Sequence, residues 1–249
     1  MITIYQIRGT NGSGKSTLVR GFIKGDPAAP ANRPGVPDSP MMVDLVSYAA
    51  PLKMNPQRRK YVEGYGSMEP GLDIIVVGSY RTACGGLDGV NSFDRQFRAI
   101  RQAVRLLSGH TEPPAEGAVL CEGVLASTVA GSWFKFAKEL RTVQIETRMA
   151  FCYLDTPVEV CLERIRKRQE AAGKVRPINE QLVRDKERAV AATREKAIAA
   201  GELVYDLPWE SADVALRAIM VDSYVVPTIA PGVVALSERV HARRVYRAS

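Results

Sequence analysis

The glycine-rich stretch GTNGSGKST, residues 9–17, constrains the fold of this chain more than any other feature. It follows the apolar run Ile2–Ile7, which predicts a buried strand, and Ser16–Phe22 can continue as a helix. Glycines at positions 9, 12 and 14 let the backbone wrap closely around an anion, and backbone amides at a helix N-terminus favour one. A strand, a glycine loop and a helix in this order indicate a βαβ unit, and therefore an α/β fold.

Five short apolar runs predict the strands of the sheet. They span Ile2–Ile7, Met41–Val46, Asp73–Val77, Ala118–Cys121 and Met149–Leu154. The runs are continuous rather than alternating, as expected for strands that are covered on both faces, and helical patterns separate several of them. We therefore expect an α/β fold with a five-strand parallel sheet sandwiched by helices.

The stretch after Ser92 gives the clearest helix. Ser92 is a good N-cap, and Gly109 is placed to end the helix. The apolar side chains that share one face are Phe93, Phe97, Ile100, Val104 and Leu107. The other side carries Arg95, Arg98, Arg101 and Arg105. This basic face is either an ordinary solvated surface or a surface that contacts phosphates. Two more helices are expected, from Thr156 to about Ala172 and from roughly Asn179 to Ala200.

Charge and cysteine content narrow the class of protein. The net charge of +7 and the pI of about 9.3 suit a polyanionic partner, but also an enzyme with a small anionic substrate. No apolar run is long enough to span a bilayer, and no signal peptide is evident. The four cysteines have no metal-binding spacing, and Cys121 and Cys152 lie in apolar runs as core residues. These features predict a reduced, cytoplasmic protein.

A length of 249 residues suits one domain with a lid and a tail. We expect that domain over residues 1–226. Residues 27–40 contain five prolines and predict a loop within it. Residues 227–249, which end in ERVHARRVYRAS, predict a basic C-terminal tail.

The first glycine stretch fits the pattern G-x-x-x-x-G-K-[ST]. In that pattern the lysine, here Lys15, reaches the β- and γ-phosphates of a nucleotide, and the hydroxyl of Ser16 binds Mg²⁺. The residues that would bind ATP or GTP are Gly9, Thr10, Asn11, Gly12, Ser13, Gly14, Lys15, Ser16 and Thr17. The motif does not separate a hydrolase from a transferase.

Glu122 in VLCEGV is the candidate second ligand of the metal. It follows the predicted strand Ala118–Cys121 at the end where ligands bind in open α/β sheets. A charge there is costly unless it is paired with a metal or a base. Glu122 is thus expected either to bind Mg²⁺ together with Ser16 or to act as the general base. The alternative is an ordinary surface glutamate.

The stretch YLDTPVEVCLERIRKR predicts a strand followed by a charged helix. Asp155 or Thr156 can cap this helix. Arg164 and Arg168 are four residues apart and share one face, where they can neutralise a transferring phosphoryl group. We expect an arginine-bearing helical lid over about residues 156–178. The alternative is a solvated helix in which glutamates pair with the arginines.

Taken together, GTNGSGKST, VLCEGV and YLDTPVEVCLERIRKR resemble the thymidylate-kinase-like branch of P-loop kinases. The three pieces frame most of residues 1–176. The resemblance implies a P-loop kinase fold with a five-strand parallel sheet and a lid that carries arginines. It also implies ATP and Mg²⁺ as cofactors, and catalytic roles for Lys15, Glu122, Arg164 and Arg168.

One stretch departs from that branch. Thymidylate and deoxynucleoside kinases carry an acidic–arginine motif after an early strand, where this chain has VVGSYRTACGGLDGV. With the basic helix, this stretch is similar to a narrower family, the bacteriophage kinases that act on 5-hydroxymethyluracil in DNA. The similarity implies phosphorylation of the hydroxymethyl group to 5-phosphomethyl-deoxyuridine, a step in thymidine hypermodification that protects viral DNA from restriction. The partner is then DNA in the host cytoplasm.

The resemblance also suggests residues for the acceptor site. Asp88 is a second candidate general base beside Glu122, or simply a turn residue next to glycine. Tyr80 is a candidate for stacking on an extruded base. The alternative functions are a deoxynucleoside or deoxynucleoside-monophosphate kinase and, from another class, a P-loop ATPase that is not a kinase. The sequence gives no oligomeric state.

Overall fold

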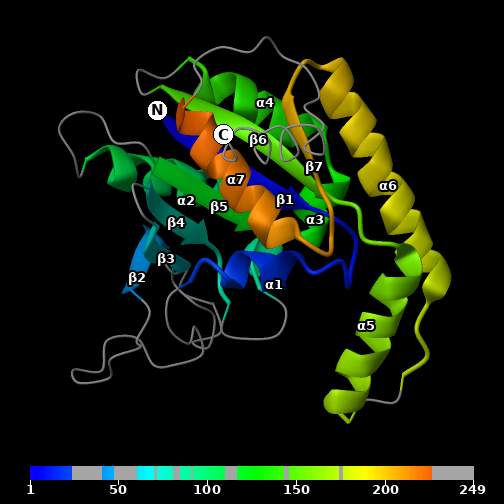
Figure 1. Ribbon diagram of the computed structural model, residues 1–249. Coiled ribbons are helices and arrows are strands. Elements are labelled where there is room, and N and C mark those ends of the chain that lie inside the picture. Colours follow the sequence, from blue (N-terminus) through cyan, green and yellow to red (C-terminus); the bar gives the residue numbers. More distant parts are fainter. Residues whose placement is uncertain are drawn as a thin grey trace, which may run out of the picture.

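A seven-stranded sheet runs through the centre of the structure (Figure 1). The computed structural model describes residues 1–23, 41–47, 61–69, 72–80, 85–90, 92–109, 117–142, 146–173 and 176–225. The strands are β1 Ile2–Arg8, β2 Met41–Ser47, β3 Tyr61–Glu69, β4 Leu72–Val77, β5 Gly117–Glu122, β6 Thr147–Leu154 and β7 Leu203–Leu207. Their order across the sheet is β2-β3-β4-β5-β1-β6-β7.

The strand pairing corrects the predicted five-strand parallel sheet. All five predicted strands are present, but β3 and β7 were missed. The neighbours in β4-β5-β1-β6-β7 pair in parallel, whereas β3 pairs antiparallel with both β2 and β4. The fold is therefore mixed α/β with a mostly parallel sheet.

Helices cover both faces of the sheet, as predicted. They are α1 Lys15–Arg20, α2 Phe93–Ser108, α3 Val124–Thr128, α4 Gly131–Leu140, α5 Val158–Ala171, α6 Glu180–Ala199 and α7 Ala212–Val225, with a short 3₁₀ helix, η1, at Leu87–Gly89. Alternate side chains of β1 enter different cores: Ile2 and Ile4 pack with α2, α3, α4 and α6, while Tyr5 and Ile7 pack with α1 and α7. The central strands are thus buried on both sides, which explains their continuous apolar runs.

Helix α2 forms where the sequence predicted it, with the predicted cap and end. The Ser92 hydroxyl accepts the Arg95 backbone N–H at 3.3 Å, and the helix stops before Gly109. Its apolar face packs into one core, where Phe97 stacks on Phe136 with ring centroids 4.2 Å apart. On the outer side, the arginines include two that form ion pairs, Arg98 with Asp94 at 3.1 Å and Arg101 with Glu139 at 2.7 Å. These pairs favour the solvated-surface interpretation for that part of the helix.

The predicted cap of α5 is wrong. The N-cap residue is Pro157, which has no side-chain cap. The Thr156 hydroxyl instead donates to the Ser13 carbonyl at 2.8 Å, and Asp155 accepts the Trp209 backbone N–H at 2.7 Å. Both side chains therefore hold loops of the site rather than the helix.

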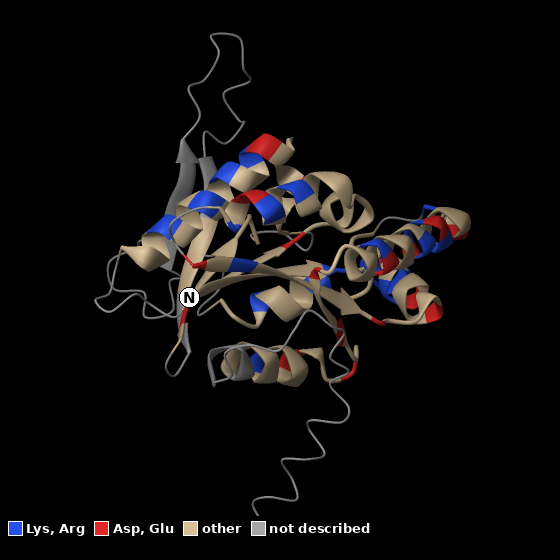
Figure 2. Cartoon of the chain, turned by 90° about the horizontal axis from the view of Figure 1, so that it is seen from above, with Lys and Arg blue, Asp and Glu red and all other residues tan. Residues whose placement is uncertain are grey.

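Helices α5 and α6 form a pair that projects from the body of the molecule (Figure 1). Basic and acidic residues intersperse along both (Figure 2). Arg166 bonds to Glu180 at 2.6 Å and Arg184 to Glu159 at 3.2 Å, so ion pairs link the two helices. Between them lies a small apolar cluster of Cys161, Leu162, Ile165 and Val183. The pair is thus a unit with its own core.

Several other predictions concern burial and the chain ends. Cys121 and Cys152 are buried free thiols in the core, as predicted. Among the described residues, no helix has the length and apolar character needed to cross a membrane. The proline-rich segment 27–40, Cys84 and the predicted tail 227–249 lie outside the described residues.

Candidate active site

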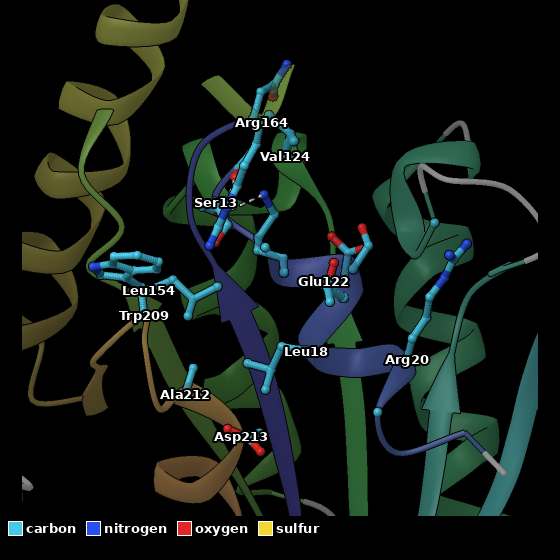
Figure 3. A pocket seen from close by; sticks show the side chains of 18 of the residues that line it. Ser13, Leu18, Arg20, Glu122, Val124, Leu154, Arg164, Trp209, Ala212 and Asp213 are labelled. Atoms are coloured by element: carbon cyan, nitrogen blue, oxygen red, sulfur yellow. Dashed lines mark hydrogen bonds between the residues drawn. The ribbon is translucent and has the colours of Figure 1, made fainter. Parts of the chain in front are cut away.

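A pocket of about 880 Å³ opens where β1, β5 and β6 end (Figure 3). Its lining brings together residues that are far apart in the sequence: Asn11 to Gly21 except Val19, Gly85, Asp88, Glu122, Val124, Leu154, Arg164, Arg168, Trp209, Ala212 and Asp213. Every residue predicted to bind the nucleotide or to be catalytic is among them except Gly9 and Thr10. Those two are buried residues at the start of the glycine loop. The sequence motifs therefore converge on one pocket.

The glycine loop needs its glycines. Gly12 and Gly14 have φ values of 80° and 98°, in the left-handed region that favours glycine. A Cβ on Gly12 would lie 2.4 Å from the Cys161 carbonyl oxygen, so α5 packs directly against the loop. The Arg164 guanidinium donates to the Ser13 carbonyl at 3.1 Å. The loop is thus shaped by its own backbone and held from outside by α5.

Lys15 is the buried cation of the loop. Only 4% of its surface is exposed, and its Nζ donates to the Thr10 carbonyl at 2.7 Å. Burial lowers the pKa of this ammonium, and the Glu122 carboxyl opposes that shift. The ammonium group therefore points along the loop, where it would contact a bound anion.

Glu122 is the last residue of β5 and lies beside Ser16. The Ser16 hydroxyl donates to Glu122 Oε1 at 2.8 Å, and the glutamate is only 1% exposed. Burial raises the pKa of the Glu122 carboxyl to about 7, while Lys15 and the Ser16 hydrogen bond lower it. The alternative of an ordinary surface glutamate is excluded. With this pKa, the Glu122 carboxyl changes its charge near neutral pH.

Two described parts of the second glycine stretch, residues 78–80 and 85–88, pack together beside Glu122. Gly86 donates its backbone N–H to the Ser79 carbonyl at 2.9 Å. A Cβ on Gly78, where φ is 117°, would lie 2.4 Å from the Gly86 carbonyl carbon. A Cβ on Gly86 would lie 2.5 Å from Glu122 Oε1. Glycines are thus required for this turn to reach the carboxyl.

Asp88 both lines the pocket and holds a helix. Its Oδ1 accepts the backbone N–H groups of Val124 at 2.7 Å and Leu125 at 3.3 Å, at the start of α3. The side chain therefore serves as a cap from a distant segment, since α3 has no side-chain cap of its own. This is a more specific structural role than that of a turn residue.

Tyr80 does not occupy the predicted position. The residue is 0% exposed and packs edge-on against Tyr65, with ring centroids 6.1 Å apart. Burial raises the pKa of its phenol well above the usual range. The predicted stacking of Tyr80 on a base is wrong for this arrangement, because both ring faces are covered by the core.

Arg164 of α5 lies at the opposite side of the pocket from Glu122 (Figure 3). The Arg164 guanidinium carbon lies 5.0 Å above the Trp209 ring centroid. Arg168, one turn further along α5, lines the same pocket. Lys167, by contrast, pairs with Glu163 at 2.6 Å on the solvated side. One face of α5 therefore lines the pocket, and another carries an exposed ion pair.

A hydrogen-bond chain fixes the start of the glycine loop. Arg8, the buried last residue of β1, donates to the Tyr153 hydroxyl at 3.4 Å, and Tyr153 meets Thr193 of α6 at 3.3 Å. Thr193 donates to the Ser127 carbonyl at 3.1 Å, and the Ser127 hydroxyl accepts the Gly9 backbone N–H at 3.3 Å. The loop is thereby tied to α3 and α6.

Sequence reasoning missed Arg20, Trp209 and Asp213. Arg20 lies one helical turn after Ser16, a spacing that places both side chains on one side of α1 and that could have drawn attention to it. Trp209 and Asp213 follow β7, the strand that was not predicted. No local motif marks them.

A glycine loop, a buried lysine and a hydroxyl–carboxylate pair meet in this pocket, and these are the features expected of a phosphotransferase site. The chain is 35% identical over 214 residues to the 5-hmdU DNA kinase of Pseudomonas phage M6, which covers 86% of this chain and 95% of that protein. It therefore belongs to the 5-hmdU DNA kinase family, and the resemblance read from the sequence is confirmed.

Two further relatives carry the same name. The protein of Pseudomonas phage PaMx11 is 30% identical over 223 residues, which is 87% of this chain and 96% of the relative. The protein of Delftia phage PhiW-14 is 27% identical over 208 residues, or 80% of this chain and 65% of the relative. Neither a family model nor a solved structure matches the chain. Membership of a kinase family implies the use of ATP.

Proposed function

We propose that this chain transfers the γ-phosphoryl group of ATP to the hydroxymethyl group of 5-hydroxymethyl-2′-deoxyuridine in DNA, within a P-loop kinase fold. The observation that carries the proposal is the identity to two phage 5-hmdU DNA kinases over almost their whole length. The product, 5-phosphomethyl-deoxyuridine, would be an intermediate in thymidine hypermodification, which protects phage DNA from host restriction.

The donor half of the pocket fits a nucleotide triphosphate. The loop from Gly9 to Thr17 would surround the phosphates with backbone N–H groups, and Lys15 would contact the β- and γ-phosphates. Leu154, Trp209 and Asp213 also line the pocket, and Arg164 lies over the Trp209 ring at one end of it. We propose that this end holds the purine base, with the flat Trp209 ring as its stacking surface.

The residues present also fit Mg²⁺. Mg²⁺ usually binds through one or two protein oxygens, substrate phosphates and water, rather than in a cage of protein ligands. The described residues contain no cluster of three or more His, Cys, Asp or Glu, whereas the Ser16 hydroxyl and the Glu122 carboxyl lie 2.8 Å apart at the loop. We propose these two as the protein's contacts to the metal, which when bound neutralises charge on the phosphates.

The acceptor is a primary alcohol, so a group that takes its proton must lie near it. Glu122 and Asp88 both line this half of the pocket. A carboxyl with a pKa of about 7 is well matched to proton transfer at neutral pH, which favours Glu122. Asp88 is fixed by the start of α3 and would shape the acceptor side, or serve as the base if Glu122 is occupied by the metal.

We propose that Arg164 and Arg168 stabilise negative charge on the transferring phosphoryl group. Both project into the pocket from the α5–α6 unit, and Arg164 already contacts the loop carbonyls. A small shift of α5 would bring the guanidinium from these carbonyls to the phosphates. This is the proposed role of residues 156–178 as a lid.

Transfer of label from γ-labelled ATP tests the acceptor. We expect the purified protein to label DNA that contains 5-hydroxymethyluracil, and to label neither thymine DNA of the same sequence nor free deoxynucleoside monophosphates. Labelling of the monophosphates alone would support the deoxynucleotide kinase alternative. Release of free phosphate regardless of acceptor would support a P-loop ATPase instead.

A further inference from the structure

Arg20 lines the pocket but has no role in the proposed mechanism. It is the last residue of α1, four positions after Ser16, and residues with this spacing have Cβ atoms about 5–6 Å apart on one side of a helix. Its side chain lines the pocket with Glu122 and Asp88. In Figure 3 it lies on the Glu122 side, away from Arg164 and Trp209. Arg20 therefore belongs to the acceptor half.

The guanidinium is held in place by the second glycine stretch. Arg20 Nη2 donates to the Tyr80 carbonyl at 2.7 Å. The neighbouring Ser79 carbonyl accepts the backbone N–H of Gly86, which packs on Glu122. Arg20 is also one of the cations that act on the Glu122 carboxyl. The bond to Tyr80 fixes the direction of the side chain.

The donor phosphates already have their own set of contacts. These are the loop amides, Lys15 and the two arginines of α5. A cation in the other half is placed for an anion that the acceptor brings, and in a DNA strand each nucleotide is flanked by phosphates. The planar guanidinium fork matches phosphate oxygens better than any other side chain.

We propose that Arg20 binds a DNA phosphate that flanks the target nucleotide, and that it thereby positions the hydroxymethyl group beside Glu122. This inference rests on the proposed function for the identity of the acceptor. It makes Arg20 a specificity residue, since a free nucleoside offers no phosphate to contact.

Neutral backbone linkages can locate the contact. The substrates are oligonucleotides with one 5-hydroxymethyluracil and a single methylphosphonate on its 5′ or 3′ side, compared with the natural backbone. We expect one of the two neutral linkages to raise the wild-type KM for DNA by about tenfold or more, the loss expected for one charge-assisted hydrogen bond. Arg20→Gln should raise KM for natural DNA by a similar factor and should no longer respond to that linkage. KM for ATP should not change.

Two further variants keep the test decisive. Arg20→Lys retains a cation and a donor for the Tyr80 carbonyl but loses the fork, so an intermediate KM is expected even if Arg20→Gln folds poorly. Arg188→Gln removes an exposed arginine of α6 that pairs with Asp185 outside the pocket, and it should behave as wild type.

Three results would overturn the inference. Wild type could be indifferent to both neutral linkages, or Arg20→Gln could respond to them as wild type does. A lower kcat at saturating DNA and ATP with an unchanged KM for DNA would instead place Arg20 on the transferring phosphoryl group. In each case wild type still phosphorylates the natural oligonucleotide. If wild type fails to do so, the proposed function itself is wrong and the inference falls with it.

Discussion

Lys15→Ala is expected to lower kcat for phosphoryl transfer by about 10²–10³-fold or more, the usual cost of removing one preorganised charge from a transition state. Lys15 is buried against the loop, and its Nζ is fixed 2.7 Å from the Thr10 carbonyl. In the proposed function, its charge would therefore act on bound phosphates with little reorganisation. Because the effect concerns the donor, it should be the same with every acceptor.

Thermal unfolding in the presence and absence of ATP gives an independent measurement. A ligand that binds only the folded state raises its stability, so wild type should melt at a higher temperature with ATP. Lys15→Ala should lose most of that increase while melting normally without ATP. Lys138→Ala, which changes an exposed lysine of α4, is the matched control and should match wild type. Full activity of Lys15→Ala would show that the loop is not the donor site.

Glu122→Gln is expected to lower kcat by about 10²–10⁴-fold, the range for loss of general acid–base catalysis. The carboxyl must be ionised to bind a metal or to accept a proton. Since burial raises its pKa to about 7, kcat/KM of wild type should rise with pH up to about 7 and level off above it. The glutamine variant should lack this rise. Steady-state kinetics between pH 5.5 and 9, roughly one to two units either side of that pKa, measure both effects.

The same group should make stability depend on pH. Its pKa rises from 4.5 in the unfolded chain to about 7 in the folded protein, so the folded state binds more protons between those values. The carboxyl therefore lowers the free energy of unfolding as pH rises through that window. Glu122→Gln should gain in melting temperature relative to wild type at pH 8 but not at pH 4.

Asp88→Asn tests which of the two candidate general bases, Glu122 or Asp88, accepts the proton. The asparagine Oδ1 can still accept the Val124 and Leu125 N–H groups, so α3 should remain in place. If Glu122 is the base, this variant keeps the rise of kcat/KM with pH, moved to lower pH because the Asp88 charge no longer raises the Glu122 pKa. A pH rise that survives in Glu122→Gln and disappears in Asp88→Asn would reverse the assignment.

The buried centre of the fold could be predicted from the sequence because central parallel strands are apolar without interruption. Strand β3 escaped because Gly64 and Gly66 break its apolar pattern, and an edge hairpin needs no continuous run. Strand β7 is only five residues long and carries Asp206. Missing β7 also hid Trp209, since site residues gather where parallel strands end.

The positions of the glycine loop and Glu122 in the pocket were predictable because each depends on contiguous residues. The spacing of Gly9 to Ser16 fixes the loop, and the end of a strand fixes Glu122. Contacts between distant segments could not be predicted in this way. Tyr80 is turned inward by Tyr65, which lies on the missed strand β3, and Thr156 donates to the glycine loop instead of capping α5. In both cases tertiary packing decides which partner a side chain meets.

The most direct test of the proposed function is to find the transferred phosphate in the DNA. The substrate is an oligonucleotide with 5-hydroxymethyluracil whose 5′ end is already phosphorylated, incubated with the protein, ATP and Mg²⁺. It is then digested to nucleotides without phosphatase and examined by mass spectrometry. We predict that the 5-hydroxymethyluracil nucleotide gains the mass of one phosphoryl group on its 5-substituent, while thymine DNA stays unchanged. Consumption of ATP with that nucleotide unmodified would contradict the account.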